Sequence, residues 1–152
     1  MIMGCTMTEE LHPKRPRRIL LADDNEVVQE VVSRVAEKHG HKVIRVTTGA
    51  GAFELAATAQ PDLIVLDIEF PDADGRDVLA KLKADERTVH IPVVVWSGRE
   101  GNDSDSRISL DLGAEDYVQK SDAQHLIAKL ERVLLRLDGG QSSRASGARR
   151  AQ

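Results

Sequence analysis

The sequence predicts an α/β fold, in which a parallel sheet of five strands carries helices on both faces. Two observations lead to this expectation. Short apolar runs alternate five times with segments of helical periodicity, and such alternation requires right-handed crossovers around a parallel sheet. The central run, Leu63-Ile64-Val65-Leu66, is apolar at every position, which is typical of a strand buried on both faces. The 152 residues suffice for one such domain, expected over 17–138.

The elements follow one another in strict order. Strands are predicted over the short β-branched and aliphatic runs at 17–22, 41–47, 62–67, 90–97 and 114–120. Helices are predicted from apolar spacing and end signals at 26–38, 50–59, 75–84, 106–112 and 122–137. Five β–α units of this length fit the flavodoxin-like (βα)5 doubly wound fold, with strand order 2-1-3-4-5.

Three of the helices carry specific expectations. Asn25 is a suitable N-cap for the first helix. Its apolar face is assigned to Val27, Val28, Val31, Val32 and Val35. The last helix has the strongest apolar face, made by Leu126, Ile127, Leu130, Val133, Leu134 and Leu137. The helix over 106–112 is only weakly apolar, which suits an element that can move.

Both ends of the chain differ in composition from its centre. Residues 1–16 contain two prolines and no apolar period, and residues 139–152 are rich in Gly, Ser, Ala and Arg, so both are expected to be disordered. Residues 1–18 carry a net charge of +2 and residues 139–152 carry +3, which leaves −9 for the centre of a chain whose total is −4. An acidic centre suits a cation and argues against nucleic acid as its ligand.

Cysteine content and hydropathy indicate the cellular compartment in which the protein is expected. The single cysteine, Cys5, excludes a disulfide framework within the chain and favours a reducing compartment. No apolar run is long enough to cross a membrane. We therefore expect a cytoplasmic protein without a membrane partner.

Polar side chains follow four of the predicted strands. These are Asp23 and Asp24, Asp67, Ser97 and Lys120. In the order 2-1-3-4-5 the four strands are neighbours, so the side chains are expected to meet at one edge of the sheet. Crowded carboxylates need a counter-charge, and their hard oxygens suit Mg²⁺. An ammonium and a hydroxyl beside them predict a site for a phosphoryl group as well.

Four segments closely resemble the receiver domain of bacterial two-component response regulators, and together they span nearly all of 17–138. They are Ile-Leu-Leu-Ala-Asp-Asp-Asn at 19–25, Leu-Asp-Ile-Glu-Phe-Pro-Asp-Ala-Asp-Gly at 66–75, Val-Val-Trp-Ser-Gly at 94–98 and Gly-Ala-Glu-Asp-Tyr-Val-Gln-Lys at 113–120. The combination is specific to the family, although each segment alone is a weak signal. No effector domain is expected after Leu137, so the resemblance is to a stand-alone receiver of the chemotaxis type.

The resemblance implies a role for each site residue. Asp67 is the expected phosphoacceptor. Asp24, Asp67 and the backbone carbonyl of Glu69 are expected to bind Mg²⁺ directly, and Asp23 through a water molecule. Lys120 is expected to neutralise the phosphoryl oxygens.

Two further residues are expected to form a switch. Ser97 would move to hydrogen-bond the phosphoryl group, and Tyr117 would then turn inward. Ser121 and Gly98 depart from the family pattern, which usually has proline and alanine at these positions.

The resemblance also implies partners. A sensor histidine kinase or a phosphotransfer protein would supply the phosphoryl group in a phosphorelay. A downstream protein would bind the surface formed by the segments 106–112, 114–120 and 122–137, which is also a candidate surface for homodimers.

Two other functions remain open at this stage. A phosphohydrolase could use Asp67 as an aspartyl nucleophile, but Glu69 stands where such enzymes usually carry a second Asp. A pseudo-receiver would keep the fold without phosphotransfer, but the complete set of Asp, Ser and Lys residues argues against it. We therefore expect a signalling module and not an enzyme, one that catalyses only its own phosphotransfer and autodephosphorylation.

Overall fold

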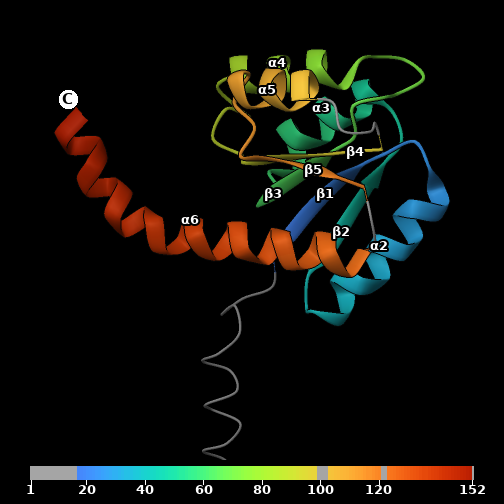
Figure 1. Ribbon diagram of the computed structural model, residues 1–152, viewed down its shortest axis with the longest axis horizontal. Helices are drawn as coiled ribbons and strands as arrows, with labels where there is room; N and C mark the ends of the chain where they lie inside the picture. Colours follow the sequence, from blue (N-terminus) through green and yellow to red (C-terminus); the bar gives the residue numbers. More distant parts are fainter. Residues whose placement is uncertain (1–16, 99–102, 121–122, 152) are drawn as a thin grey trace, which may run out of the picture.

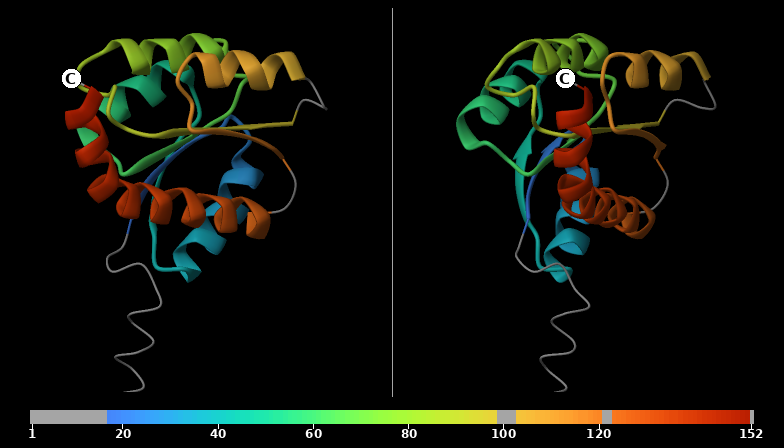
Figure 2. Two further views of the ribbon diagram at one scale, coloured as in Figure 1. Left: turned by 60° about the vertical axis from the view of Figure 1, so that its left-hand side comes forward. Right: turned by 90° about the vertical axis from the view of Figure 1, so that its left-hand side faces the viewer.

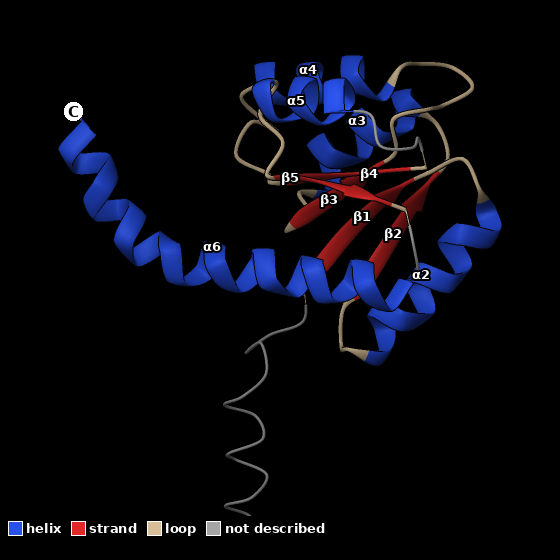
Figure 3. Cartoon of the chain, viewed as in Figure 1, coloured by secondary structure: helices blue, strands red, loops and turns tan. Residues whose placement is uncertain are grey.

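The computed structural model describes residues 17–98, 103–120 and 123–151 (Figure 1). Its five strands are parallel and pair in the order β2-β1-β3-β4-β5, which confirms the predicted topology (Figure 3). The strands are β1 (Arg18–Ala22), β2 (Lys42–Val46), β3 (Leu63–Leu66), β4 (Val93–Ser97) and β5 (Asp116–Gln119). The arm predicted over 1–16, with Cys5, lies outside the described residues.

Helices cover both faces of the sheet (Figures 1 and 2). They are α2 (Glu26–Lys38), α3 (Gly49–Ala59), α4 (Gly75–Ala84), α5 (Asp103–Asp111) and α6 (Ala123–Ala151). One core cluster joins α2 and α6 to the sheet, and a second joins α3 and α4 to the other face. No helix in the described part of the chain combines the length and the apolar character that a bilayer crossing requires.

Alternating strand residues build the two cores. In β3, Leu63 and Val65 enter the cluster with α2 and α6, whereas Ile64 and Leu66 enter the cluster with α3 and α4. All four side chains are at most 1% exposed. Successive side chains of a strand point to opposite faces, so a central strand of a doubly covered sheet must be apolar throughout. The sequence of β3 therefore fixes it in the middle of the sheet.

Side chains cap the helices that begin next to the strand ends. Asn25 is the N-cap of α2, as predicted, and its Oδ1 accepts a hydrogen bond of 3.1 Å from the Val28 N–H. Thr48 caps α3 in the same way, and Asp74 caps α4. Each cap satisfies an N–H that has no partner within the helix. The helices therefore start at defined positions beside the edge of the sheet.

The predicted buried face of α2 was wrong in part. The buried residues are Gln29, Val32, Ser33 and Ala36, which follow one another at helical spacing. Val27 and Val31 are 73% and 48% exposed. Five valines span a wider arc than the stripe that faces the sheet, so two of them lie on the solvent side.

The last two helices also differ from the expectation. Helix α5 begins at Asp103 instead of Ser106. Helix α6 continues to Ala151, where the sequence predicted a disordered tail from residue 139. No proline interrupts the tail, and its Ala, Arg and Gln residues are good helix formers that offset its glycines and serines. The predicted apolar face of α6 is confirmed, because Leu126, Leu130 and Val133 are at most 2% exposed.

Two leucines of α6 test this packing. Leu130 is fully buried in the core, whereas Leu135 on the same helix is 56% exposed. We expect Leu130→Ala to lower the free energy of unfolding by about 2–5 kcal/mol, because it removes buried methyl groups and leaves a cavity. Leu135→Ala should cost less than about 1 kcal/mol. Urea unfolding measures both values, and equal losses would contradict the observed orientation of α6.

Candidate functional site

Backbone hydrogen bonds continue past the strand ends and place Asp23, Asp67 and Lys120 at one edge of the sheet. The Asp67 N–H donates to the carbonyl of Ala22 at 2.9 Å, and the Asp23 N–H donates to that of Val46 at 3.1 Å. The Lys120 N–H donates to the carbonyl of Ser97 at 2.7 Å. The pairing of the sheet thus extends by one residue and holds these positions at its carboxyl edge.

Three carboxylates crowd together at this edge. One oxygen each of Asp23, Asp24 and Asp67 lies within 4.8 Å of the others. Asp23 and Asp67 are only 1% and 6% exposed, whereas Asp24 is open to solvent. The cluster therefore has a buried floor and one accessible side.

Lys120 supplies the positive charge. Its Nζ lies 2.7 Å from Asp23 Oδ2 and 3.5 Å from Asp67 Oδ2. Burial lowers the pKa of Lys120, but the two carboxylates outweigh burial and raise the pKa above its usual value. The ammonium therefore stays charged at neutral pH and offsets one of the three carboxylates.

Asp67 is the carboxylate whose environment is least favourable to charge. Burial raises the pKa of Asp67 to about 6, and the neighbouring Asp23 adds to the rise. Lys120 and the N–H groups of Ile68 and Glu69 oppose it. These two N–H groups donate to Asp67 Oδ1 at 2.7 and 3.4 Å. One oxygen is thus held by the backbone, while Oδ2 faces the ammonium.

The turn after Asp67 depends on a glycine. A Cβ atom at Gly75 would lie 2.2 Å from the carbonyl oxygen of Asp67 and 2.6 Å from the Cα of Ile68. Only glycine permits this approach of two backbone segments. Gly75 therefore lets the loop over 67–75 fold back and brings the start of α4 beside Asp67.

The donor set fits a hard divalent cation. Oxygen ligands from few carboxylates are what Mg²⁺ takes in proteins, and it keeps several waters that an exposed side accommodates. A cation would also offset the negative charge that Lys120 leaves unbalanced. Asp24 and Asp67 are the carboxylates that would hold it, together with the backbone carbonyl of Glu69 in the adjoining turn.

The two residues of the expected switch lie on β4 and β5. Ser97 is the last residue of β4, which is the neighbour of β3, and it is 1% exposed. Tyr117 pairs with Val95 in the sheet and packs against the core beneath α3 and α4. Its hydroxyl is buried and has no hydrogen-bond partner among the described residues. Ser121 lies outside the described residues.

Sequence reasoning missed two residues that support the site. The Gln29 amide is buried and donates to the carbonyls of Asp23 and Val46 at 2.9 and 2.7 Å, so it fixes the loop after β1. Asp72 accepts hydrogen bonds from the Gly49 and Ala50 N–H groups at the start of α3, and these bonds lower its pKa. A polar residue on the buried helical stripe was the available signal for Gln29. The partners of Asp72 are 22 and 23 residues away, so no local pattern indicates this contact.

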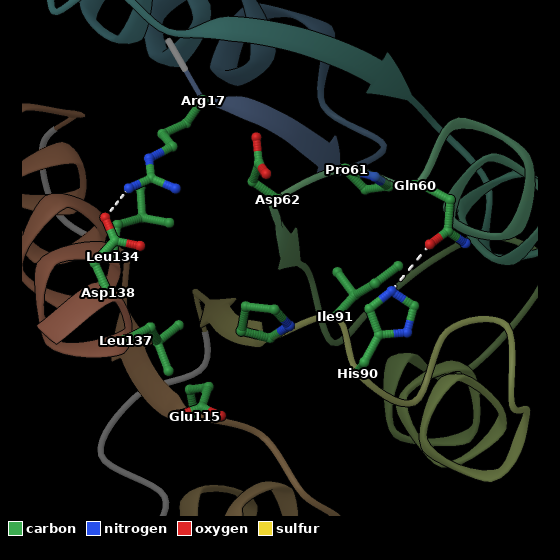
Figure 4. A pocket seen from close by; sticks show the side chains of 11 residues that line it. Arg17, Gln60, Pro61, Asp62, His90, Ile91, Glu115, Leu134, Leu137 and Asp138 are labelled. Carbon is green, nitrogen blue, oxygen red and sulfur yellow. Dashed lines mark hydrogen bonds and ion pairs between the residues drawn. The ribbon is translucent and has the colours of Figure 1, made fainter. Parts of the chain in front are cut away.

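A cavity of about 310 Å³ lies at the opposite edge of the sheet (Figure 4). It opens beside Asp62 and Pro92, which precede β3 and β4. Arg17 and Asp138 form an ion pair on its wall, and His90 Nε2 lies 2.9 Å from Gln60 Oε1. The acidic cluster is therefore separate from this cavity and forms an open site on the carboxyl edge.

Comparison with known proteins identifies the family of the chain. Residues 19–131 match the model of the response regulator receiver domain. The chain is 37% identical over 122 residues to the DNA-binding dual master transcriptional regulator RpaA of Synechocystis, covering 80% of this chain and 50% of that protein. It is 32% identical over 105 residues to the polar-differentiation response regulator DivK of Brucella anthropi, covering 69% and 85%. The chain thus spans about half the length of RpaA and most of DivK.

Solved structures agree with the fold. The receiver domain of a LuxO repressor protein from Vibrio parahaemolyticus superposes with a TM-score of 0.76 at 23% identity, covering 84% of this chain and 97% of that one. The phosphorylated cyanobacterial phytochrome response regulator RcpA superposes with a TM-score of 0.65 at 31% identity, covering 78% and 91%. The five-stranded order and the surrounding helices are therefore those of a receiver domain.

The raised pKa of Asp67 predicts that the stability of the metal-free protein depends on pH. Between pH 3.8 and about 6 the folded state binds more protons than the unfolded chain, so the free energy of unfolding falls as the pH rises through this range. Asp67→Asn removes the charge. At pH 7.5 with a chelator, we expect the variant to be about 1–3 kcal/mol more stable than the wild type, and equally stable near pH 3.5.

Urea unfolding across this pH range measures the difference. Asp62→Asn, at the other end of β3, is the matched control and should follow the wild-type profile. Parallel profiles for Asp67→Asn and the wild type would contradict the buried, crowded environment of Asp67.

Proposed function

The chain belongs to the response regulator receiver domain family, and from this premise we propose that it is a signalling module that accepts a phosphoryl group on Asp67. The observation that carries the proposal is the carboxylate of Asp67, which shares the Lys120 ammonium with Asp23 and lies within 4.8 Å of Asp23 and Asp24. Receiver domains are modules of two-component signalling. We place its action in the cytoplasm, as is typical of the family.

The transfer itself is a substitution at phosphorus. A carboxylate oxygen of Asp67 attacks the phosphorus of a phosphohistidine, the P–N bond breaks, and the leaving imidazole nitrogen keeps the electron pair. Oδ2 is the attacking oxygen, because the backbone N–H groups hold Oδ1. The ionised form of Asp67 is required, so transfer slows as the pH falls through the pKa of this carboxyl.

The residues around Asp67 stabilise the negative charge of the phosphoryl group during transfer. Lys120 Nζ, already 3.5 Å from Asp67 Oδ2, stabilises charge on the transferred oxygens. Asp24, Asp67 and the carbonyl of Glu69 would hold Mg²⁺, and Asp23 would act through a bound water. When bound, Mg²⁺ supplies a Lewis acid beside the phosphoryl oxygens and offsets the carboxylate charge.

Phosphorylation would then change the surface near α5. We infer that Ser97 moves to hydrogen-bond the phosphoryl group, and that Tyr117 occupies the space this movement leaves. Ile108 and Leu110 of α5 are 39% and 46% exposed, so these two apolar side chains bind the helix only weakly to the core. The acyl phosphate therefore acts on an element that can shift between two positions.

The proposed partners follow from this scheme. A histidine kinase or a phosphotransfer protein supplies the phosphoryl group. A downstream protein, or a second copy of the chain, binds the surface of α5, β5 and α6. RpaA is described as a DNA-binding regulator, but it is twice as long as the region it shares with this chain, and we propose no nucleic-acid contact here.

A small phosphodonor tests the acceptor. We expect acetyl phosphate with Mg²⁺ to add one phosphoryl group to the wild type, measured as a mass increase or on a phosphate-affinity gel. Asp67→Asn should abolish the labelling, because the amide is no nucleophile, whereas Asp62→Asn, directly before the same strand, should label like the wild type. Labelling that survives Asp67→Asn would refute the assignment.

The same assay separates the alternative functions. Rapid multiple turnover of phosphate monoesters would favour a phosphohydrolase with Asp67 as its nucleophile. A protein that binds Mg²⁺ but never becomes labelled, by a small phosphodonor or by a kinase, would be a pseudo-receiver.

Metal binding and phosphoryl transfer should separate by mutation. Asp24→Asn removes a charged ligand, and we expect it to weaken Mg²⁺ binding by about tenfold or more. Lys120→Met removes the competing cation but no ligand, so Mg²⁺ binding should persist while the labelling rate falls about 10²-fold or more. Isothermal titration and labelling at saturating Mg²⁺ measure the two effects. Loss of Mg²⁺ binding in Lys120→Met would contradict the division of roles.

A further inference from the structure

Trp96 stands directly before Ser97 on β4 and is the only tryptophan of the chain. It is 3% exposed and belongs to the core cluster beneath α2 and α6. Its indole N–H is buried and has no hydrogen-bond partner among the described residues. Packing alone would be served by an aliphatic side chain, which buries no unpaired donor. The ring must therefore be explained by what lies on its face.

The face of the ring carries the ammonium of the site. Lys120 Nζ lies 5.3 Å from the centroid of the Trp96 ring, within the range of a cation–π contact. The register of the sheet produces this contact, because Trp96 pairs with Val118, two residues before Lys120. The ammonium thus has two carboxylates and one aromatic face around it.

We propose that Trp96 is a positioning residue for phosphotransfer, which holds the Lys120 ammonium at the transfer site through its ring face. This inference rests on the proposed function. A lysine side chain has four rotatable bonds and loses much rotamer freedom when its ammonium is fixed. The negative face of the indole supplies a fixed site for the ammonium. In this position the ammonium is also close to the carboxylates of Asp23 and Asp67.

An uncharged partner such as Trp96 allows Lys120 to change its contacts when the phosphoryl group is transferred to Asp67. When Asp67 becomes an acyl phosphate, its ammonium partner must turn from the carboxylate to the phosphoryl oxygens. A third carboxylate near Lys120 would compete with the phosphoryl group for the ammonium. The indole attracts the cation but carries no net negative charge, so it competes with the phosphoryl oxygens less than a carboxylate would. Trp96 therefore guides Lys120 without neutralising it.

Three variants separate positioning from packing. Trp96→Leu keeps an apolar side chain but removes the ring, and Trp96→Phe keeps a smaller ring in the same place. Leu130→Ala removes apolar bulk from the same core cluster but no ring. We expect all three to destabilise the fold, so labelling is compared at a temperature where circular dichroism shows each variant to be folded.

We expect Trp96→Leu to lower the rate of labelling by acetyl phosphate at saturating Mg²⁺ by about three- to tenfold. Trp96→Phe should restore most of this rate, and Leu130→Ala should label like the wild type. Equal rates for Trp96→Leu and Leu130→Ala would overturn the proposal.

Tryptophan emission tests the contact without any phosphotransfer. Because Trp96 is the only indole, the emission maximum of the wild type reports its surroundings alone. Lys120→Met removes the cation from the ring face, and we expect a shift of the maximum that Arg136→Met, on α6, does not produce. An unchanged spectrum in Lys120→Met would overturn the proposal even if the wild type is labelled. Failure of the wild type to label, with the shift present, would instead refute the proposed function.

Discussion

Asp23, Asp24 and Asp67 crowd one edge of the sheet, where the Lys120 ammonium pairs with Asp23 and Asp67, and the rest of the site depends on this imbalance of charge. Lys120 lies 2.7 Å from Asp23 and 3.5 Å from Asp67, so it offsets part of the negative charge but not all of it. Burial raises the pKa of Asp67 to about 6, which shows that the metal-free site disfavours full ionisation. The folded chain therefore holds negative charge that a cation can stabilise.

The backbone of the fold holds the three carboxylates close together and so maintains the excess of negative charge. The sheet is buried on both faces, and its hydrogen bonding continues past β1, β3 and β5, so the carboxylates cannot move apart without breaking backbone hydrogen bonds. Gln29 fixes the loop after β1, and Gly75 lets the loop after Asp67 fold back. The free energy that opposes the charge crowding comes from the apolar cores, which are remote from the chemistry.

Much of this arrangement could be predicted from the sequence, for a physical reason. In a parallel sheet all carboxyl ends meet at one edge, so the strand order alone brings Asp23, Asp67 and Lys120 together. The sequence did not predict which side chains of α2 are buried or which residues Gln29 contacts, because these depend on neighbours that are distant in the sequence. The side of α2 that faces the sheet excludes Val27 and Val31. Gln29 donates hydrogen bonds to backbone carbonyls, which every residue has, so the sequence does not indicate its partners. The ring of Trp96 under Lys120 follows from register and side-chain rotamers together.

The central claim is that this crowded edge holds one divalent cation beside Asp67. A crystal structure of the protein grown with Mg²⁺ tests it most directly. The account predicts a single octahedral ion with oxygen ligands at about 2.0–2.1 Å, two of them from Asp24 and Asp67, and Lys120 Nζ still facing Asp67. An edge that stays empty at saturating Mg²⁺, or an ion bound away from Asp67, would contradict it.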